Sequence, residues 1–241
     1  MSLLLFSNST MASRSFLSHA RTWLDTQVQT AGREAVFVPY AAVSADRHSR
    51  DAFDVYARRV GEVFRAFGCT VRSVHEVDDP YTAVRDAAHV IVGGGNSFLL
   101  LHRLQESGLL SEIQQVVRAG ASYTGWSAGA ILAGPTIGTT NDMPVVWPES
   151  PDACSFVPFH INPHYIAESP AGYGGETRPD RLNEFLKLHP ESPVIAMPEG
   201  TGIVVAAKRL EILGATGLPC FSAADSQRSF GALELSRRFF A

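Results

Sequence analysis

The sequence predicts an α/β protein with a mostly parallel sheet flanked by helices. Short apolar runs rich in β-branched and aromatic residues alternate with longer amphipathic segments, and strands that alternate with helices form parallel sheets. The chain has 241 residues, of which 45% are hydrophobic, so it can bury a sizeable core without disulfides or metal. We expect residues 1–241 to form a single α/β domain, because no linker, repeat or shift in composition divides them.

The first half of the chain carries the clearest alternation. Strands are expected where apolar runs are too short for a stable helix and end at turn residues: Leu3–Ser7, Ala35–Tyr40, Thr70–Val77, His89–Gly93 and Ala121–Trp126. Helices are expected in the amphipathic segments between them: Arg14–Thr30, Asp46–Phe67, Thr82–Ala87, Ser97–Glu106 and Leu109–Ala119. A further buried helix begins at Ser127.

The second half is less regular. The segment Gly134–Pro179 is rich in turn residues, and a loop of that length in a folded domain is usually functional. A helix is expected from about Arg178 to Leu188, with Thr177 and Asp180 spaced as a capping box. The remaining expected strands are Pro193–Met197, Gly202–Ala207 and Leu210–Leu213, with Lys208-Arg209 as a hairpin turn.

Composition excludes several classes of partner and place. The net charge is −4 without a basic block, which argues against nucleic acid as a partner. The three cysteines, Cys69, Cys154 and Cys220, are widely spaced, so they predict neither a disulfide framework nor a zinc site. No signal peptide or membrane-spanning run is visible, and we expect a soluble cytoplasmic protein. The oligomeric state stays open, with a homodimer as one option.

The segment Gly125-Trp126-Ser127-Ala128-Gly129 is the strongest functional motif. It is a G-x-S-x-G sequence at a junction of strand and helix, where a sharp turn presents a serine oxygen at the carboxyl edge of the sheet. The glycines are needed because side chains would clash across the turn. The alternative is a helix start packed on the sheet, with Ser127 as its N-cap. The context favours Ser127 as a nucleophile.

A nucleophilic serine needs a base, and His164 is the candidate. It lies in Phe159-His160-Ile161-Asn162-Pro163-His164, where the rigid proline can direct the side chain that follows it. A zinc site at His160 and His164 is not expected, because no glutamate follows His160 and Pro163 interrupts a helical face. We interpret His160 as structural.

Two acids qualify to hold the imidazole, namely Asp142 and Glu199. Asp142 follows the serine in Asn141-Asp142-Met143-Pro144, where the alternative is an Asx-turn. Glu199 stands in Pro198-Glu199-Gly200 at the exit of an expected strand, where the alternative is a solvated loop carboxylate. Residue patterns leave both acids open. We favour Glu199 slightly as the direct partner, because it leaves a strand at the sheet edge where Ser127 must lie.

Gly93-Gly94-Gly95-Asn96 closes one expected strand and opens a helix. Bare amide groups at such a junction bind anions, either a phosphate or a developing oxyanion. The dinucleotide-binding motif is incomplete because Phe98 stands where it needs a glycine. The P-loop motif is incomplete because its Gly-Lys-Ser/Thr sequence is absent. An oxyanion hole formed by the amides of Gly95 and Ala128 fits the usual arrangement beside a nucleophilic serine.

Six segments, in order along nearly the whole chain, closely resemble the aspartyl dipeptidases of the S51 family of serine peptidases. They are Leu4–Thr10, Val92–Phe98, Gly125–Ala130, Thr139–Pro144, Asn162–His164 and Pro198–Gly200. The resemblance implies a flavodoxin-like fold similar to class I glutamine amidotransferases, and cleavage of dipeptides with N-terminal aspartate, without a cofactor. It implies Ser127 as nucleophile and His164 as base, and it leaves Asp142 and Glu199 both open as the acid.

The resemblance also implies a cation for the aspartyl carboxylate, and Arg178 matches that position. A guanidinium suits a carboxylate because it binds in a bidentate way. Asn96 and Glu176 are further candidates for substrate binding, with Glu176 facing the free amine of the peptide. The competing hypotheses are a cyanophycinase-like peptidase of the same family and a catalytically silent protein that binds a small anion.

Overall fold

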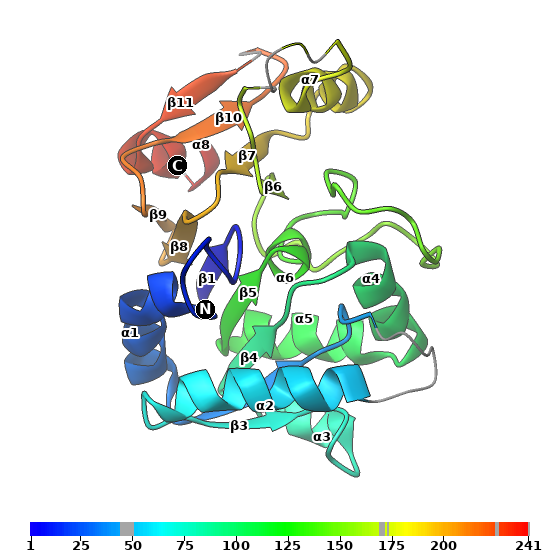
Figure 1. Ribbon diagram of the computed structural model, residues 1–241, viewed down its shortest axis with the longest axis vertical. Helices are drawn as coiled ribbons and strands as arrows, with labels where there is room; N and C mark the ends of the chain where they lie inside the picture. The colour runs from blue at the N-terminus through cyan, green and yellow to red at the C-terminus, as the bar shows by residue number, and fades with distance from the viewer. Residues whose placement is uncertain (44–50, 169–171, 173, 225–226, 241) are drawn as a thin grey trace.

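A seven-stranded sheet, called here the main sheet, contains all the strands of the first half of the chain and two strands of the second half (Figure 1). The computed structural model describes residues 1–43, 51–168, 172, 174–224 and 227–240. The main sheet contains, in spatial order, β3 (Thr70–Ser73), β2 (Glu34–Val38), β4 (His89–Val92), β5 (Ser122–Trp126), β1 (Ser2–Phe6), β8 (Gly202–Ala206) and β9 (Arg209–Leu213). The first five strands are parallel to one another, β8 is antiparallel to β1, and β9 is antiparallel to β8. The predicted mostly parallel α/β sheet is therefore confirmed.

Helices cover both faces of the main sheet because its side chains alternate between two apolar clusters. Leu4 and Phe6 of β1 pack in the cluster that includes buried residues of α1 (Arg21–Ala31) and α2 (Asp51–Arg65). Leu3 and Leu5 point into the opposite cluster. That cluster includes buried residues of α3 (Pro80–Arg85), α4 (Ser97–Glu106), α5 (Leu109–Ala119) and α6 (Ala128–Ile131). None of the helices in the described ranges is long and apolar enough to cross a lipid bilayer.

A second sheet of four strands, called here the small sheet, lies at one end of the molecule (Figure 1). Its spatial order is β11 (Arg228–Phe230), β10 (Leu218–Phe221), β7 (Val194–Met197) and β6 (His160–Pro163). Only the β6–β7 pair is parallel. Leu182 and Leu186 of α7 (Arg178–Leu188) pack on this sheet beside Phe221. The chain ends its described part in α8 (Ala232–Phe240), which contacts β9.

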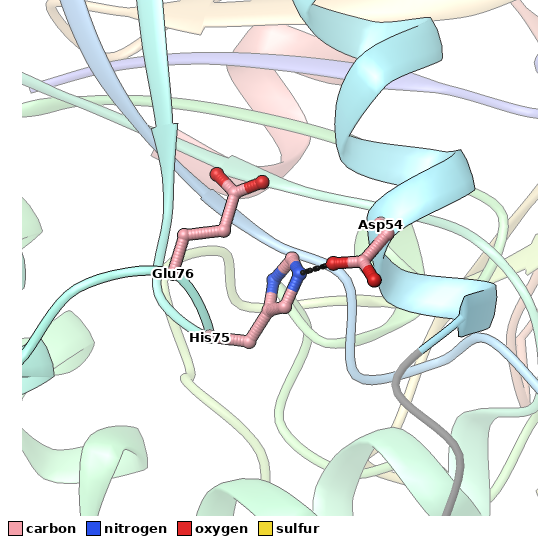
Figure 2. Close-up of side chains that lie close together, drawn as sticks. All are labelled: Asp54, His75 and Glu76. Atoms are coloured by element: carbon pink, nitrogen blue, oxygen red, sulfur yellow. Dashed lines mark hydrogen bonds and ion pairs between the residues drawn. The ribbon is translucent and has the colours of Figure 1, made fainter.

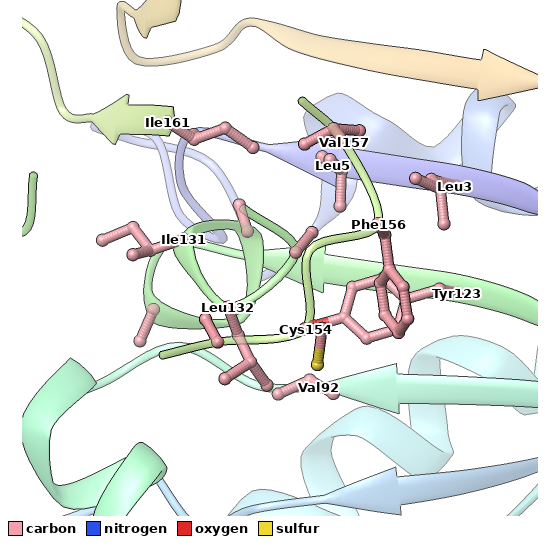
Figure 3. Close-up of a cluster of buried hydrophobic side chains, with 14 of the residues drawn as sticks. Leu3, Leu5, Val92, Tyr123, Ile131, Leu132, Cys154, Phe156, Val157 and Ile161 are labelled. Carbon is pink, nitrogen blue, oxygen red and sulfur yellow. The ribbon is translucent and has the colours of Figure 1, made fainter. Parts of the chain in front are cut away.

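The two sheets share one buried apolar cluster. Leu3 and Leu5 of β1 belong to the same buried cluster as Ile161 of β6 and Val157 just before it, and Figure 3 shows Val157 next to Leu5. A core shared by both sheets is consistent with the single domain expected for residues 1–241, which stays a prediction. The packing fixes how the carboxyl ends of strands from both sheets approach each other.

Several element predictions differ from the structure. The expected irregular segment Gly134–Pro179 contains β6, and the small sheet as a whole was not expected. The helix expected from Arg14 begins at Arg21, because it is preceded by a short 3₁₀ helix, η1 (Ser18–Ala20), which itself follows Leu17 at φ 55°. The expected strand Thr70–Val77 ends at Ser73. The expected helix over residues 46–67 is α2, and its first five residues lie outside the described part.

One local prediction is confirmed, and another is shifted by one residue. Thr177 and Asp180 form a reciprocal capping box at the start of α7. The hairpin between β8 and β9 turns at Ala207 and Lys208, one residue earlier than expected, and both have positive φ, as a tight hairpin turn requires.

Candidate active site

Ser127 occupies a strained turn between β5 and α6. Its backbone has φ 51° and ψ −115°, an unfavourable conformation for a side-chain-bearing residue. The turn forms because its neighbours are glycines. A Cβ at Gly125 would lie 2.4 Å from the Gly129 carbonyl oxygen, and a Cβ at Gly129 would lie 2.2 Å from the Val92 oxygen. Close backbone packing therefore holds the serine at the carboxyl edge of the main sheet.

His164 and Glu199 complete a hydrogen-bonded chain that begins at Ser127. Ser127 Oγ lies 3.0 Å from His164 Nε2, and His164 Nδ1 lies 3.0 Å from Glu199 Oε1. A carboxylate only accepts hydrogen bonds, so Nδ1 carries the proton shared with Glu199 and Nε2 is left to accept the serine proton. The side chains of His164 and Glu199 are 40% and 53% exposed, so substrate and water can reach the chain. This arrangement can generate a serine nucleophile.

Asp142 belongs to a different hydrogen-bond network. Its Oδ2 atom accepts from both the amide and the hydroxyl of Ser97, each at 2.7 Å, and from Thr140 Oγ1 at 3.0 Å. The neighbouring Asn141 donates from Nδ2 to the Pro163 carbonyl at 2.9 Å, directly before His164. Asp142 thus fixes the start of α4 and the loop that supports the histidine, while Glu199 is the acid in contact with the imidazole.

The glycine-rich turn after β4 lies against the serine. A Cβ at Gly94 would be 3.0 Å from Ser127 Cβ, and one at Gly95, where φ is 142°, would be 2.1 Å from the Ala41 carbonyl oxygen. Gly95 is exposed. The Ala128 amide is the first of α6, so no carbonyl within the helix can accept its proton. The oxyanion hole expected at the amides of Gly95 and Ala128 stays a prediction.

Tyr56 of α2 holds the glycine-rich turn after β4 by hydrogen bonds. Its hydroxyl oxygen accepts hydrogen bonds from the Gly94 amide and from Trp126 Nε1, both at 2.8 Å. Burial raises the pKa of the Tyr56 phenol well above its ordinary value, so the hydroxyl stays neutral. Trp126, the residue before Ser127, is therefore tied to the glycine turn by a side chain of α2, which the sequence did not reveal.

The three candidate substrate residues occupy two places. Arg178 is half-buried in the first turn of α7, and none of the described residues pairs with its guanidinium. Burial, together with the nearby Arg181, lowers the pKa of Arg178. Glu176 is exposed and lies 3.8 Å from Arg181 Nε. Asn96 caps α4 by accepting from the Leu99 amide and donates to the Met143 carbonyl, which leaves one amide proton for a substrate.

Two functional neighbours were missed by the motif search. Ser7 and Asn8 follow β1 and are almost completely buried, and they contact the segments that carry His164 and Glu199. The signal that could have found them is their position: β1 is parallel to β5, with Phe6 in register with Trp126, so Ser7 leaves the sheet at the same edge as Ser127.

The described residues contain one cluster of metal-ligand type, and it is remote from the serine. Figure 2 shows Asp54 of α2 with His75 and Glu76, which follow β3. Two strands of the main sheet, β2 and β4, lie between β3 and β5. His75 already has partners on both ring nitrogens, Ser73 Oγ at 2.7 Å and Asp54 Oδ1 at 3.0 Å. These two hydrogen bonds account for the position of His75 beside Asp54.

The fold and the serine–histidine–carboxylate chain define the class of a serine hydrolase of α/β type. The model of peptidase family S51 matches residues 3–213, so the chain belongs to peptidase family S51. It is 43% identical over 225 residues to peptidase E of Escherichia coli O6:K15:H31 and to peptidase E of Shigella flexneri; in each case 93% of this chain and 95% of the relative are covered.

A solved structure has a similar fold. A peptidase from an acI-B1 actinobacterium superposes with a TM-score of 0.70, covering 96% of this chain and 94% of that one at 18% identity. The predicted S51 membership and the predicted α/β fold are therefore confirmed, and this chain is a peptidase of the S51 family.

Proposed function

We propose that this chain hydrolyses dipeptides with N-terminal aspartate, using Ser127 as nucleophile, His164 as base and Glu199 as the acid that orients the base. The observation that carries the proposal is the continuous chain of two 3.0 Å contacts from Ser127 through His164 to Glu199. The resemblance of six segments to aspartyl dipeptidases and the identity to proteins named peptidase E support the substrate class.

The mechanism follows from the positions of the donors and acceptors. Ser127 Oγ attacks the peptide carbonyl carbon while His164 Nε2 takes its proton. The carbonyl oxygen becomes an oxyanion, held by the amides of Gly95 and Ala128. His164 then gives the proton to the departing amine, the C–N bond breaks, and an ester on Ser127 remains. Water, activated by the same imidazole, hydrolyses that ester and restores the serine.

Arg178 is proposed to read the aspartyl side chain. A half-buried guanidinium without a partner among the described residues offers two parallel donors for a carboxylate. Glu176 is proposed to receive the free amine, although Arg181 competes for its carboxylate, and Asn96 contributes its remaining amide proton. A cytoplasmic location remains part of the proposal, because all three cysteines are buried and none forms a disulfide, as a reducing compartment allows. A homodimer stays a prediction.

Substrate comparison tests this function. The purified chain should cleave Asp-Leu, cleave Asn-Leu and Glu-Leu much more slowly, and leave β-aspartyl polymer intact. A serine-directed phosphonate should label Ser127, as peptide mass spectrometry will show. Hydrolysis of the polymer would favour the cyanophycinase-like alternative, and a chain that neither cleaves nor reacts would favour the silent binding protein.

Arg178 provides the sharper test of specificity. Arg178→Ala should lower kcat/KM for Asp-Leu by about 30- to 5,000-fold, the scale for truncating one side of a buried charge pair, and should change Asn-Leu much less. Arg178→Lys should recover only part of the loss, because an ammonium cannot make the two-pronged contact. Lys187→Ala, which removes an exposed cation from the same helix, is the control. Equal losses on both dipeptides would show that the aspartate is read elsewhere.

A further inference from the structure

The proposed catalytic residues come from different sheets. Ser127 follows β5 of the main sheet, whereas His164 follows β6 and Glu199 follows β7, both of the small sheet. The 3.0 Å contact between Ser127 and His164 therefore depends on how the two sheets are held at this edge. Apolar packing sets the approach of the sheets, but it is not directional, so polar contacts are needed to fix the last ångström.

Ser7 makes such contacts with both segments of the small sheet. Its side chain is fully buried, with 0% exposure. The hydroxyl donates to the Met197 carbonyl at 2.8 Å and accepts the His164 amide at 2.9 Å. A hydroxyl can donate and accept at the same time, which an alanine or a carbonyl cannot do. Ser7 thus links the end of β6 to the end of β7 from a strand of the main sheet.

The contact to the His164 amide falls at a strained residue. His164 has φ 53°, in the left-handed region that side-chain-bearing residues rarely adopt. Such a conformation persists only where the surroundings enforce it. Ser7 restrains the amide of His164, and Asn141 restrains the carbonyl of Pro163 directly before it. The direction of the imidazole is set by this pair of hydrogen bonds.

Asn8 makes the equivalent contact on the acid. It is 2% exposed, and its Oδ1 atom accepts the Gly200 amide at 2.8 Å. Its Nδ2 atom donates to the Thr10 carbonyl at 2.8 Å and approaches Met11 Sδ at 3.2 Å, so the side-chain amide is held in one orientation. Glu199 therefore lies between two restrained backbone groups, the Met197 carbonyl on Ser7 and the Gly200 amide on Asn8.

We propose that Ser7 and Asn8 are positioning residues that hold the His164–Glu199 pair of the small sheet in register with Ser127 of the main sheet. The proposal rests on the proposed function, in which these three residues act together. Neither Ser7 nor Asn8 touches the reacting atoms. Losing Ser7 leaves the part-buried His164 amide without this partner, and losing Asn8 does the same to the Gly200 amide, while the Met197 carbonyl still accepts from the Tyr165 amide. Either loss frees a segment that must be correct to a fraction of an ångström, and a displacement of about 1 Å can cost about 100-fold in rate.

Steady-state kinetics with a matched control tests Ser7. Ser7→Ala should lower kcat for Asp-Leu by about 30- to 100-fold and change KM by less than about threefold, because the substrate contacts are untouched. The control is Ser73→Ala. Ser73 is also a buried serine at the carboxyl end of a strand of the main sheet, where its hydroxyl contacts the Phe37 carbonyl and a histidine, His75. It should lose comparable stability and keep kcat within about threefold. Equal kcat values for both variants would overturn the proposal.

A double-mutant cycle tests Asn8 independently and also serves if Ser7→Ala fails to fold. Asn8→Ala should reduce kcat about tenfold in the unaltered chain, but less than about twofold in the Glu199→Gln variant, because Asn8 acts through the acid that this variant has already disabled. A general structural role would give the same factor in both backgrounds. Additive losses would therefore overturn the assignment of Asn8.

Proton NMR separates failure of this inference from failure of the proposed function. The Nδ1 proton of a histidine bonded to a carboxylate resonates far downfield, and His164→Ala and Glu199→Gln would assign it. Ser7→Ala should broaden or shift that signal, while Ser73→Ala should leave it unchanged. If the unaltered chain is inactive, the proposed function is wrong, yet the signal still reports on the pair. An unchanged signal in Ser7→Ala would overturn the positioning role.

Discussion

The two sides of the proposed active site are held by different kinds of interaction. On the main sheet, Ser127 is fixed by close packing, since Gly125 and Gly129 leave no room for even one added carbon. On the small sheet, His164 and Glu199 project from strand ends that are restrained by hydrogen bonds from Ser7 and Asn8. Shape fixes one side, and donors and acceptors fix the other.

The comparison teaches that the two sides fail in different ways. A contact at the limit of van der Waals approach cannot tolerate a larger residue, so changes there cost folding stability. A hydrogen-bonded segment tolerates changes in size but loses direction when a donor or acceptor disappears, so changes there cost rate. Substitutions on the two sides should separate stability from catalysis.

The largest effect is expected where the two sides meet. Ser127→Ala should lower hydrolysis of Asp-Leu by about 10⁴-fold or more with little change in unfolding, because the backbone packing remains. His164→Ala should be nearly as damaging, and the double variant should be little worse than either, since the residues act as a unit. Steady-state rates and thermal unfolding measure both. Losses that multiply in the double variant would contradict a joint site.

The next effect distinguishes the two acids. Glu199→Gln should lower kcat/KM by about 10³-fold, because an amide holds the wrong imidazole tautomer and supplies no charge. Asp142→Asn should cost less than about tenfold, because its remaining oxygen can still accept from Ser97. Kinetics at one pH measures both. A fully active Gln variant together with an inactive Asn variant would reverse the assignment.

The packed side should respond in stability. Gly129→Ala places a carbon where the Val92 carbonyl oxygen already lies, so it should reduce the free energy of unfolding by about 3 kcal/mol. Gly61→Ala, at a half-buried position of α2 with open space at its Cβ, should be neutral or stabilising, and it is the control. Denaturant unfolding of both variants measures the difference. A stable Gly129→Ala would refute the packing account.

The main sheet should also weaken in acid. His89 of β4 is buried, and its Nε2 atom contacts Thr124 Oγ1 at 2.8 Å. Burial lowers the pKa of His89 from 6.5 to about 4. The unfolded chain therefore takes up a proton at a pH where the folded chain does not. The contribution of neutral His89 to the free energy of unfolding is complete above pH 6.5. It is lost as the pH falls toward 4, and the loss is about 2 kcal/mol at pH 5.

A variant that cannot titrate isolates this contribution. His89→Gln keeps a polar partner for Thr124, so the difference in unfolding free energy between the variant and the unaltered chain should change by that amount between pH 7 and pH 5. Denaturant unfolding at the two pH values measures it. A constant difference would mean that folding does not lower the pKa of His89.

The sequence predicted the main sheet well because its strands are buried on both faces and read as apolar runs. It did not reveal β6, since His160, Asn162 and Pro163 give that strand the composition of a loop, and their burial comes from neighbours distant in sequence. β10 was missed for a similar reason, because Pro219 interrupts it. Their pairing with β7 is a tertiary effect.

The same limit explains the candidate site. Ser127 and the glycine turn could be predicted because local sequence dictates a sharp turn after a strand. Asp142 and Glu199 could not be separated, because the choice depends on which loop the imidazole meets across two sheets. Ser7 and Asn8 were overlooked as residues of common type, and only their burial and their contacts with distant segments reveal them.

The long separation of these contacts has a consequence for synthesis of the chain. Ser7 and Met197 are 190 positions apart, and β1 also pairs with β8. At about 5–20 residues per second, roughly 10 to 40 s pass between the appearance of these partners. A nascent chain that already contains Ser127 therefore has no acid for its histidine, and one edge of β1 stays open. Under the proposed mechanism, proteolytic activity begins only after Glu199 has been synthesised, and shorter chains expose a strand edge that chaperones or proteases can capture.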